Sequence, residues 1–214
     1  MIPEPPDPNH VTRGQAGSWT VYPATSRPPA EVLYPGAFNP LHSAHLRIAK
    51  LAGQRTNQRV DFEISLENVD KPPVSNEEIH RRTAAFPAKA IIWLTRAPTF
   101  VDKARLFPSC TWLVGADTLA RIADPRYYGS VSGRDVALAE LADRDCRFLV
   151  FGRLIGARFV TLNDLDLPPG LRRRCQTVAP EFRMDISSTE LRARMPQGGT
   201  RSNGQDCQLG NRGP

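Results

Sequence analysis

Short apolar segments alternate with amphipathic segments through the middle of the chain. In residues 59–66, Val60, Phe62, Ile64 and Leu66 recur at every second position, which is typical of a strand. Further apolar segments that predict strands are 31–34, 90–94, 111–114, 147–151, 159–162 and 176–178. The segments that predict helices are 42–51, 77–86, 100–107, 116–123, 133–143 and 187–195. This alternation predicts a single α/β domain, with a parallel sheet covered by helices on both faces.

The two ends of the chain lack this pattern. Residues 1–29 are rich in proline, which removes backbone donors and disfavours helix, so we interpret them as an irregular arm. Within that arm, residues 19–22 are apolar enough for a short strand or a docking patch. Residues 196–214 carry hardly any apolar side chain and predict a disordered tail. The folded domain is therefore expected to span residues 30–195.

The composition fits a globular cytoplasmic protein. Of 214 residues, 40% are hydrophobic and 23% are charged, so the chain can bury a core. No apolar run approaches the roughly 20 residues that span a bilayer, and residues 1–18 lack the features of a secretory signal. The four cysteines have no spacing typical of a zinc site, so we expect free thiols. We therefore predict no membrane partner.

The formal net charge of +6 suits an anionic partner, but it does not choose among nucleotide, nucleic acid and acidic membrane. A nucleic-acid binder is disfavoured, because the chain shows no pattern of interleaved aromatic and basic residues. The arginine triplet at 172–174 is interpreted as a solvated loop rather than a nucleic-acid site. A homo-oligomer is compatible with the sequence.

The first segment that suggests chemistry lies where the strand at 31–34 gives way to the helix at 42–51. Gly36 allows a ligand to approach the backbone closely, and the start of the helix offers free amides to phosphates. His42 and His45 are three residues apart and therefore share one helical face, where they could hold a phosphate chain. A surface turn with two chance histidines and a metal-binding pair are the alternatives for a bare pair of this spacing.

The second segment is the helix start at 185–192. Ser187 and Glu190 have the spacing of a capping box, which alone would explain them. A helix start rich in hydroxyls, with Arg192 one turn further on, is also suited to hold phosphates.

Together these two segments resemble the nucleotidylyltransferase superfamily, the adenylyl- and cytidylyltransferases with a Rossmann-like fold. Gly36, Phe38, Pro40, His42 and His45 match its GxFxPxHxGH motif, and residues 186–192 are similar to its ISSTxIR motif. Ala44 replaces the glycine that precedes the second histidine. The resemblance implies that His45, assisted by His42, stabilises charge at the α-phosphate of ATP. It also implies that Ser187, Ser188 and Arg192 hold the β- and γ-phosphates and the departing pyrophosphate.

A third segment, Gly115 and Asp117 after the strand at 111–114, could be an ordinary strand-to-helix turn with Asp117 as its cap. It also resembles the GxDxL element of the nicotinate and nicotinamide mononucleotide adenylyltransferases, in their cytidylyltransferase-like branch. The ATP-binding residues implied by the resemblance are Gly36, Ala37, Phe38, His42, His45, Gly115, Asp117, Ile186, Ser187, Ser188 and Arg192. The acceptor-binding residues implied in the same way are Lys71, Arg82, Thr99 and Phe100.

The resemblance implies transfer of an adenylyl group from ATP to nicotinate or nicotinamide mononucleotide, with release of pyrophosphate. The partners are then ATP and a phosphorylated small-molecule acceptor. Mg²⁺ is expected to be carried on the ATP phosphates, with no protein metal site. A cytidylyltransferase, a phosphopantetheine-type adenylyltransferase and a nucleotide-binding regulator weakened by Ala44 are the alternatives.

Overall fold

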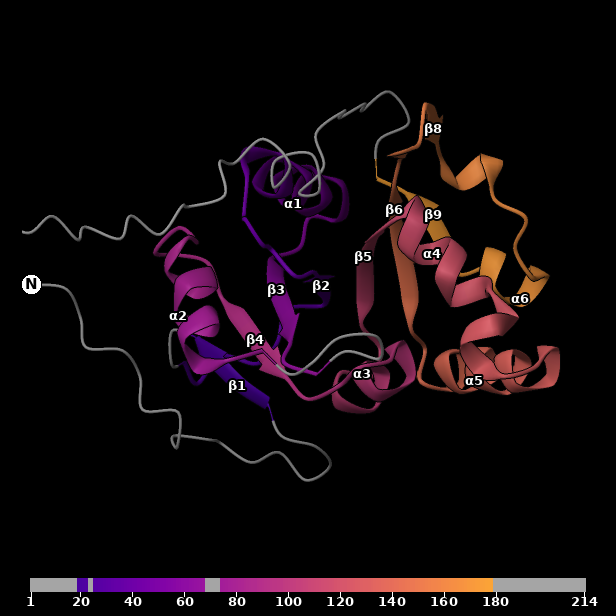
Figure 1. Cartoon of the computed structure of the whole chain (residues 1–214), viewed down its shortest axis with the longest axis horizontal. Helices are drawn as coiled ribbons and strands as arrows, with labels where there is room; N and C mark the ends of the chain where they lie inside the picture. Colours follow the sequence, from indigo (N-terminus) through magenta and orange to yellow (C-terminus); the bar gives the residue numbers. More distant parts are fainter. Residues whose placement is uncertain (1–18, 23–24, 68–73, 179–214) are drawn as a thin grey trace, which may run out of the picture.

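The computed structural model describes residues 19–22, 25–67 and 74–178. Seven strands form one sheet in the order β1-β4-β3-β2-β5-β6-β9 (Figure 1). Their bounds are Trp19–Tyr22 (β1), Val32–Pro35 (β2), Val60–Ser65 (β3), Ile92–Thr95 (β4), Thr111–Gly115 (β5), Arg147–Phe151 (β6) and Cys175–Thr177 (β9). Strand β1 pairs antiparallel with β4, and all other pairs in this sheet are parallel.

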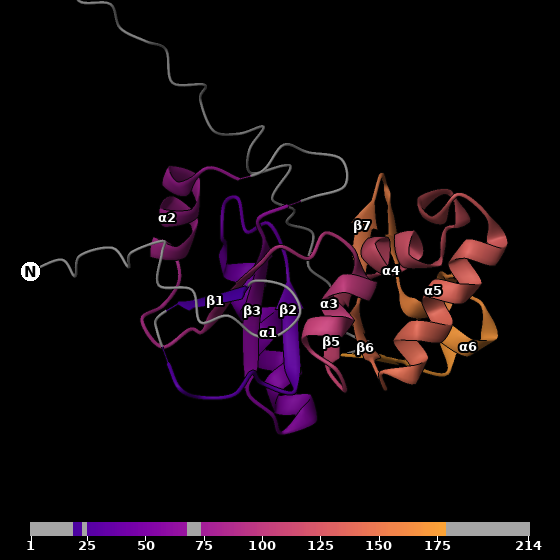
Figure 2. The ribbon, with the colours of Figure 1, turned by 90° about the horizontal axis from the view of Figure 1, so that it is seen from below.

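Helices follow most of the parallel strands, as the alternation predicts. They are α1 (Ser43–Thr56), α2 (Asn76–Ala84), α3 (Phe100–Leu106), α4 (Ala116–Ala123), α5 (Val131–Asp143) and α6 (Pro169–Arg172). The 3₁₀ helices Pro125–Tyr128 (η1) and Leu162–Asp164 (η2) complete the helical elements of the described residues. Strands β7 (Arg153–Ile155) and β8 (Arg158–Val160) form a separate antiparallel hairpin, which lies beside α4 (Figure 2).

Apolar side chains are buried on both faces of the sheet. On one face, Ile48 and Ala52 of α1 pack in a cluster with Tyr34 and Phe62 of the strands. On the other face, helices α3, α4 and α5 contribute Ala104, Leu119, Ile122 and Leu141 to a cluster with Trp93, Trp112 and Phe148. Burial on both faces is what a parallel sheet requires, and it confirms the predicted Rossmann-like α/β fold in one domain.

Strand β3 carries carboxylates on a face that is also buried. Asp61 accepts bonds from Arg59 Nε at 2.8 Å and from Trp93 Nε1 at 2.9 Å. Glu63 accepts from Lys103 Nζ of α3 at 2.7 Å, and both side chains of this pair are less than 7% exposed. The period-two pattern of residues 59–66 therefore identifies the strand, while Asp61 and Glu63, between the apolar positions, are buried rather than solvated.

The predicted elements differ from the structure mainly at the sheet margins. Residues 19–22, for which the sequence left a short strand and a docking patch open within the irregular arm, form the edge strand β1. The strand predicted at 159–162 is Arg158–Val160 in the β7–β8 hairpin and does not join the main sheet. The helix predicted at 187–195 and the tail at 196–214 lie outside the described residues. Among the described residues, no helix is long and apolar enough to cross a membrane.

The chain reverses its direction across the sheet at β2. From β2 the sheet continues through β3 and β4 on one side, and through β5, β6 and β9 on the other. In open α/β sheets, ligands bind outside the carboxyl ends of the strands at such a switch point. Those ends are Pro35 of β2 and Gly115 of β5, the two places where the sequence predicts nucleotide contacts.

Candidate active site

The turn between β2 and α1 is held tightly against the sheet. The Gly36 amide donates to the Glu63 carbonyl at 2.9 Å, and a Cβ at Gly36 would lie 2.8 Å from Phe38 Cζ. Phe38 has a φ of 44° and is 3% exposed, with its ring centroid 5.0 Å from that of His45. Glycine is thus required beside a buried aromatic ring that supports the second histidine. Ala44, which replaces the glycine of the motif, is buried within α1 and is 1% exposed.

The two motif histidines are stacked at the beginning of α1. Their ring centroids are 3.7 Å apart with an interplanar angle of 30°. His42 is the N-cap residue, and its backbone N–H donates to His45 Nδ1 at 3.3 Å. With Nδ1 as the acceptor, the neutral His45 ring carries its proton on Nε2, which makes Nε2 a hydrogen-bond donor. The pair therefore offers imidazole donors beside the free amides of the helix start.

The protonation of both histidines is disfavoured in the folded protein. Burial, the neighbouring His42 and Arg153 together lower the pKa of His45 from its ordinary value of 6.5 to about 3. Burial and Arg153 also lower the pKa of His42. At neutral pH, His45 thus acts as a neutral N–H donor in the unliganded protein, and not as a fixed positive charge.

The carboxyl end of β5 forms the neighbouring part of the site. Gly115 is the N-cap of α4, and a Cβ there would lie 2.5 Å from Asp117 Oδ1 and 2.9 Å from Arg153 Cγ. Arg153 Nε lies 3.4 Å from Asp117 Oδ1, with the two side chains 27% and 38% exposed. Asp117 is thus paired with a cation and does not serve as a side-chain cap of α4. Arg153 also lowers the pKa of both motif histidines, so these groups share one electrostatic environment.

Arg153 is a residue that the sequence reasoning missed. It begins β7, directly after Gly152 and the predicted strand at 147–151. An arginine following a glycine at the carboxyl end of a predicted strand was the available signal. Because the sheet order was not known from the sequence, nothing indicated that this strand end lies beside Gly115.

Helix α2 fixes the same turn from the other side. Arg82, one of the predicted acceptor-binding residues, donates to the Ala37 carbonyl at 3.2 Å and to Glu78 Oε1 at 2.7 Å. Glu78 in turn accepts from Asn39 Nδ2 at 2.8 Å. The predicted ATP-binding turn and the predicted acceptor-binding helix are therefore in direct contact.

The other predicted acceptor-binding residues are placed differently. Thr99 is the N-cap of α3, where its hydroxyl accepts from the Asp102 amide at 3.1 Å. The Phe100 ring packs against Trp112 and Phe148, with centroids 5.8 and 6.0 Å apart, so it contributes to the core cluster beneath α3. These contacts give both side chains structural roles. Lys71, Ile186, Ser187, Ser188 and Arg192 lie outside the described residues.

The candidate site combines features suited to bind a nucleotide. A parallel sheet presents a glycine turn, a histidine pair and a second glycine at its switch point, an arrangement suited to a nucleotide's phosphates. Comparison with protein families matches residues 33–194 to the cytidylyltransferase-like family, within the nucleotidyltransferase superfamily, and the chain belongs to this family. Membership implies nucleotidyltransferase activity on nucleotide substrates. A search of curated proteins gives no match.

Arg153→Met should raise the KM for the nucleoside triphosphate by about tenfold or more. The reason is that a charge-assisted hydrogen bond contributes roughly 1.5–3 kcal/mol, and about 1.4 kcal/mol corresponds to a factor of ten. Steady-state kinetics would measure the KM. Arg126→Met is the control, because it removes the same charge from a side chain that is 87% exposed. An unchanged KM in a folded Arg153 variant would exclude Arg153 from triphosphate binding.

The free energy of unfolding should fall as the pH falls from about 6.5 towards 3. Over this interval the unfolded chain protonates His45, whereas the folded protein, with the lower pKa, does not, so acid favours the unfolded state. Urea unfolding at a series of pH values should show a shallower dependence for His45→Gln than for the natural chain. Identical slopes for the two proteins would show that the His45 pKa is not lowered.

Proposed function

We propose that the protein transfers an adenylyl group from ATP to nicotinate or nicotinamide mononucleotide and releases pyrophosphate. The observation that carries this proposal is the stacked His42–His45 pair at the start of α1, beside Gly36 and the switch point of the sheet. The GxDxL resemblance at Gly115 and Asp117 supports the mononucleotide acceptor.

The chemistry requires positioning and charge stabilisation rather than a covalent intermediate. A phosphate oxygen of the acceptor attacks the α-phosphorus of ATP, and the bond from that phosphorus to the pyrophosphate oxygen breaks. The attacking oxygen is already anionic, so no general base is needed. The residues of the site suit this requirement, because they supply neutral imidazole donors, a guanidinium and helix amides.

In this proposal, Nε2–H of His45 donates to an α-phosphate oxygen as negative charge accumulates there. A neutral donor stabilises that charge, but it attracts the ground-state phosphate less strongly than a positively charged imidazolium would. This difference favours the transition state over the ground state. His42 and the first amides of α1 hold the phosphate chain. Ser187, Ser188 and Arg192 are proposed, from the sequence motif, to hold the β- and γ-phosphates and the leaving pyrophosphate.

Mg²⁺ is proposed to enter on the ATP phosphates, whose charge it partly neutralises. The donors of the described site fit this assignment, because His42, His45 and Arg153 are groups that bind phosphate oxygens rather than Mg²⁺. The carboxylate beside them, Asp117, is paired with Arg153.

The test is pyrophosphate release from purified protein with Mg²⁺ and a nucleoside triphosphate. ATP and CTP are each combined with nicotinate mononucleotide, nicotinamide mononucleotide, phosphopantetheine and no acceptor. Release that needs both ATP and one of the two nicotinic mononucleotides is expected. Release with CTP or with phosphopantetheine would replace the proposed substrates, and ATP binding without release for any acceptor would favour a nucleotide-binding regulator.

A further inference from the structure

A cavity of about 550 Å³ opens at the edge of the sheet opposite the candidate active site. Thr111 and Arg147, the first residues of β5 and β6, line it, whereas Gly36 and Gly115 lie after the carboxyl ends of β2 and β5. A five-residue strand spans about 16 Å, so the cavity and the active site are separate. Its volume lies in the range of sites for small molecules, roughly 300–1,000 Å³.

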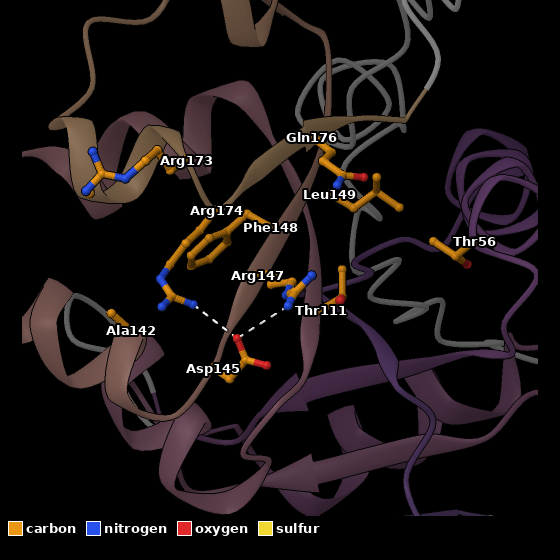
Figure 3. A pocket seen from close by; sticks show the side chains of 11 residues that line it. Thr56, Thr111, Ala142, Asp145, Arg147, Phe148, Leu149, Arg173, Arg174 and Gln176 are labelled. Carbon is orange, nitrogen blue, oxygen red and sulfur yellow. Dashed lines mark hydrogen bonds and ion pairs between the residues drawn. The ribbon is translucent and has the colours of Figure 1, made fainter.

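The cavity is basic. Arg147, Arg173 and Arg174 line it, against a single lining carboxylate, Asp145 (Figure 3). Arg173 and Arg174 belong to the triplet that the sequence analysis interpreted as a solvated loop. The structure places them in the turn between α6 and β9, where Arg173 is exposed and both residues also line a concave site.

The guanidinium groups of the cavity are only loosely satisfied by the protein. Asp145 is shared by Arg174 at 3.3 Å and Arg147 at 3.6 Å, and Figure 3 shows both side chains directed towards its one carboxylate. Arg173 forms no ion pair with any residue that the structure describes. Close charge-assisted bonds measure about 2.7–2.9 Å. Arg105 reaches that range twice, at 2.7 and 2.9 Å from the two oxygens of Glu140, so the cavity contrasts with an ordinary ion pair of this protein.

We propose that this cavity is a second binding site, for a small molecule that carries a phosphate monoester. A guanidinium presents planar paired donors that match phosphate oxygens. Arg147 and Arg174 share one carboxylate, and Arg173 adds a third positive charge to the lining, which leaves a positive balance for a dianion. The Thr111 hydroxyl and the Gln176 amide, also in the lining, suit the hydroxyl groups of a sugar or polyol attached to the phosphate. The site is independent of the proposed function, because none of its residues belongs to the active site.

The test shows which arginines a bound ligand covers as well as whether the ligand binds. The full chain is treated with phenylglyoxal, which modifies accessible arginines, in the presence of ribose 5-phosphate, inorganic phosphate or uncharged ribose. Mass spectrometry then measures modification at each arginine. Ribose 5-phosphate is expected to protect Arg147 and Arg173 most strongly, inorganic phosphate less, and ribose not at all. Arg126, which is 87% exposed on η1, serves as the unprotected reference.

Calorimetric titration of ribose 5-phosphate supplies the second measurement. Arg173→Ser should weaken the binding event by about tenfold, while Arg126→Ser, which removes the same charge, should leave it unchanged. Arg173 is exposed and has no described ion pair, so its substitution should leave the fold intact, as circular dichroism would check. The proposal is overturned by unchanged modification at all three cavity arginines, by protection confined to Arg82 or Arg153, or by protection by an oligonucleotide but not by ribose 5-phosphate.

Discussion

His45→Ala should lower kcat by about 10²–10³, with a much smaller effect on the affinity for ATP. Removal of one preorganised donor that acts on charge developed in the transition state typically costs this much, or roughly 2.7–4 kcal/mol. The His45 side chain is suited to that role because its Nδ1 accepts from the His42 amide, which directs its proton to Nε2. Steady-state kinetics with ATP and the accepted mononucleotide, together with equilibrium binding of ATP, would measure the two effects separately.

A matched control is available on α2. His80→Ala removes a histidine from a helix without touching the motif, and it should leave kcat near the natural value. Arg192→Ala should differ from both variants, because a contact to phosphates that are already charged in the ground state raises the KM for ATP as well. A folded His45→Ala protein with natural kcat would end the catalytic interpretation of the histidine pair.

Lys103→Met should reduce the free energy of unfolding by about 3–5 kcal/mol, the usual cost of leaving one member of a buried ion pair unpaired. The side chains of Glu63 and Lys103 are 1% and 6% exposed, and their charged atoms are 2.7 Å apart. The Thr95 hydroxyl donates to the same Glu63 oxygen at 2.5 Å, but the other oxygen, Oε2, has no hydrogen-bond partner among the described residues. Without Lys103, the carboxylate would thus lose its only described cationic partner.

Two further variants separate the ion pair from simple loss of packing. Arg105 lies on the same helix as Lys103, and Arg105→Met breaks a more exposed pair with Glu140 of α5. This variant should destabilise the protein far less, because water screens both partners. The double variant Glu63→Met, Lys103→Met should recover much of the stability, since apolar replacement of both partners removes the unpaired charge. Urea unfolding measures all three. A Lys103→Met protein as stable as Arg105→Met would contradict the assignment.

The sequence predicted those parts of the candidate site whose geometry depends on local order along the chain. Gly36, His42 and His45 are local, because a turn and the first helical turn bring them together without help from the rest of the fold. Arg153 escaped prediction because its neighbour Asp117 is reached only through the pairing of β5 with β6. Phe100 is a different case, since a motif resemblance could not reveal that its ring packs against the core cluster.

The buried carboxylates of β3 show why an alternating pattern carried limited information. Val60, Phe62 and Ile64 identify one apolar face, and on an exposed sheet Asp61 and Glu63 would then face water. Asp61 is paired with Arg59 on the same strand, but Glu63 is compensated by Lys103 of α3, 40 residues further along the chain. Only the tertiary fold brings such a partner into place, so no local pattern could have indicated it.

Strand β1 covers the side of β4 that faces away from the rest of the sheet. It pairs along Ile92–Thr95 of β4 in antiparallel register, while Val21 and Tyr22 pack against the apolar clusters on the two faces. A chain shortened to begin at residue 25 would leave one side of β4 with unpaired amides and carbonyls. An uncovered edge of this kind is a template for strands of other molecules. The proline-rich segment thus contains the four-residue strand that pairs this side of β4 and itself becomes the edge of the sheet.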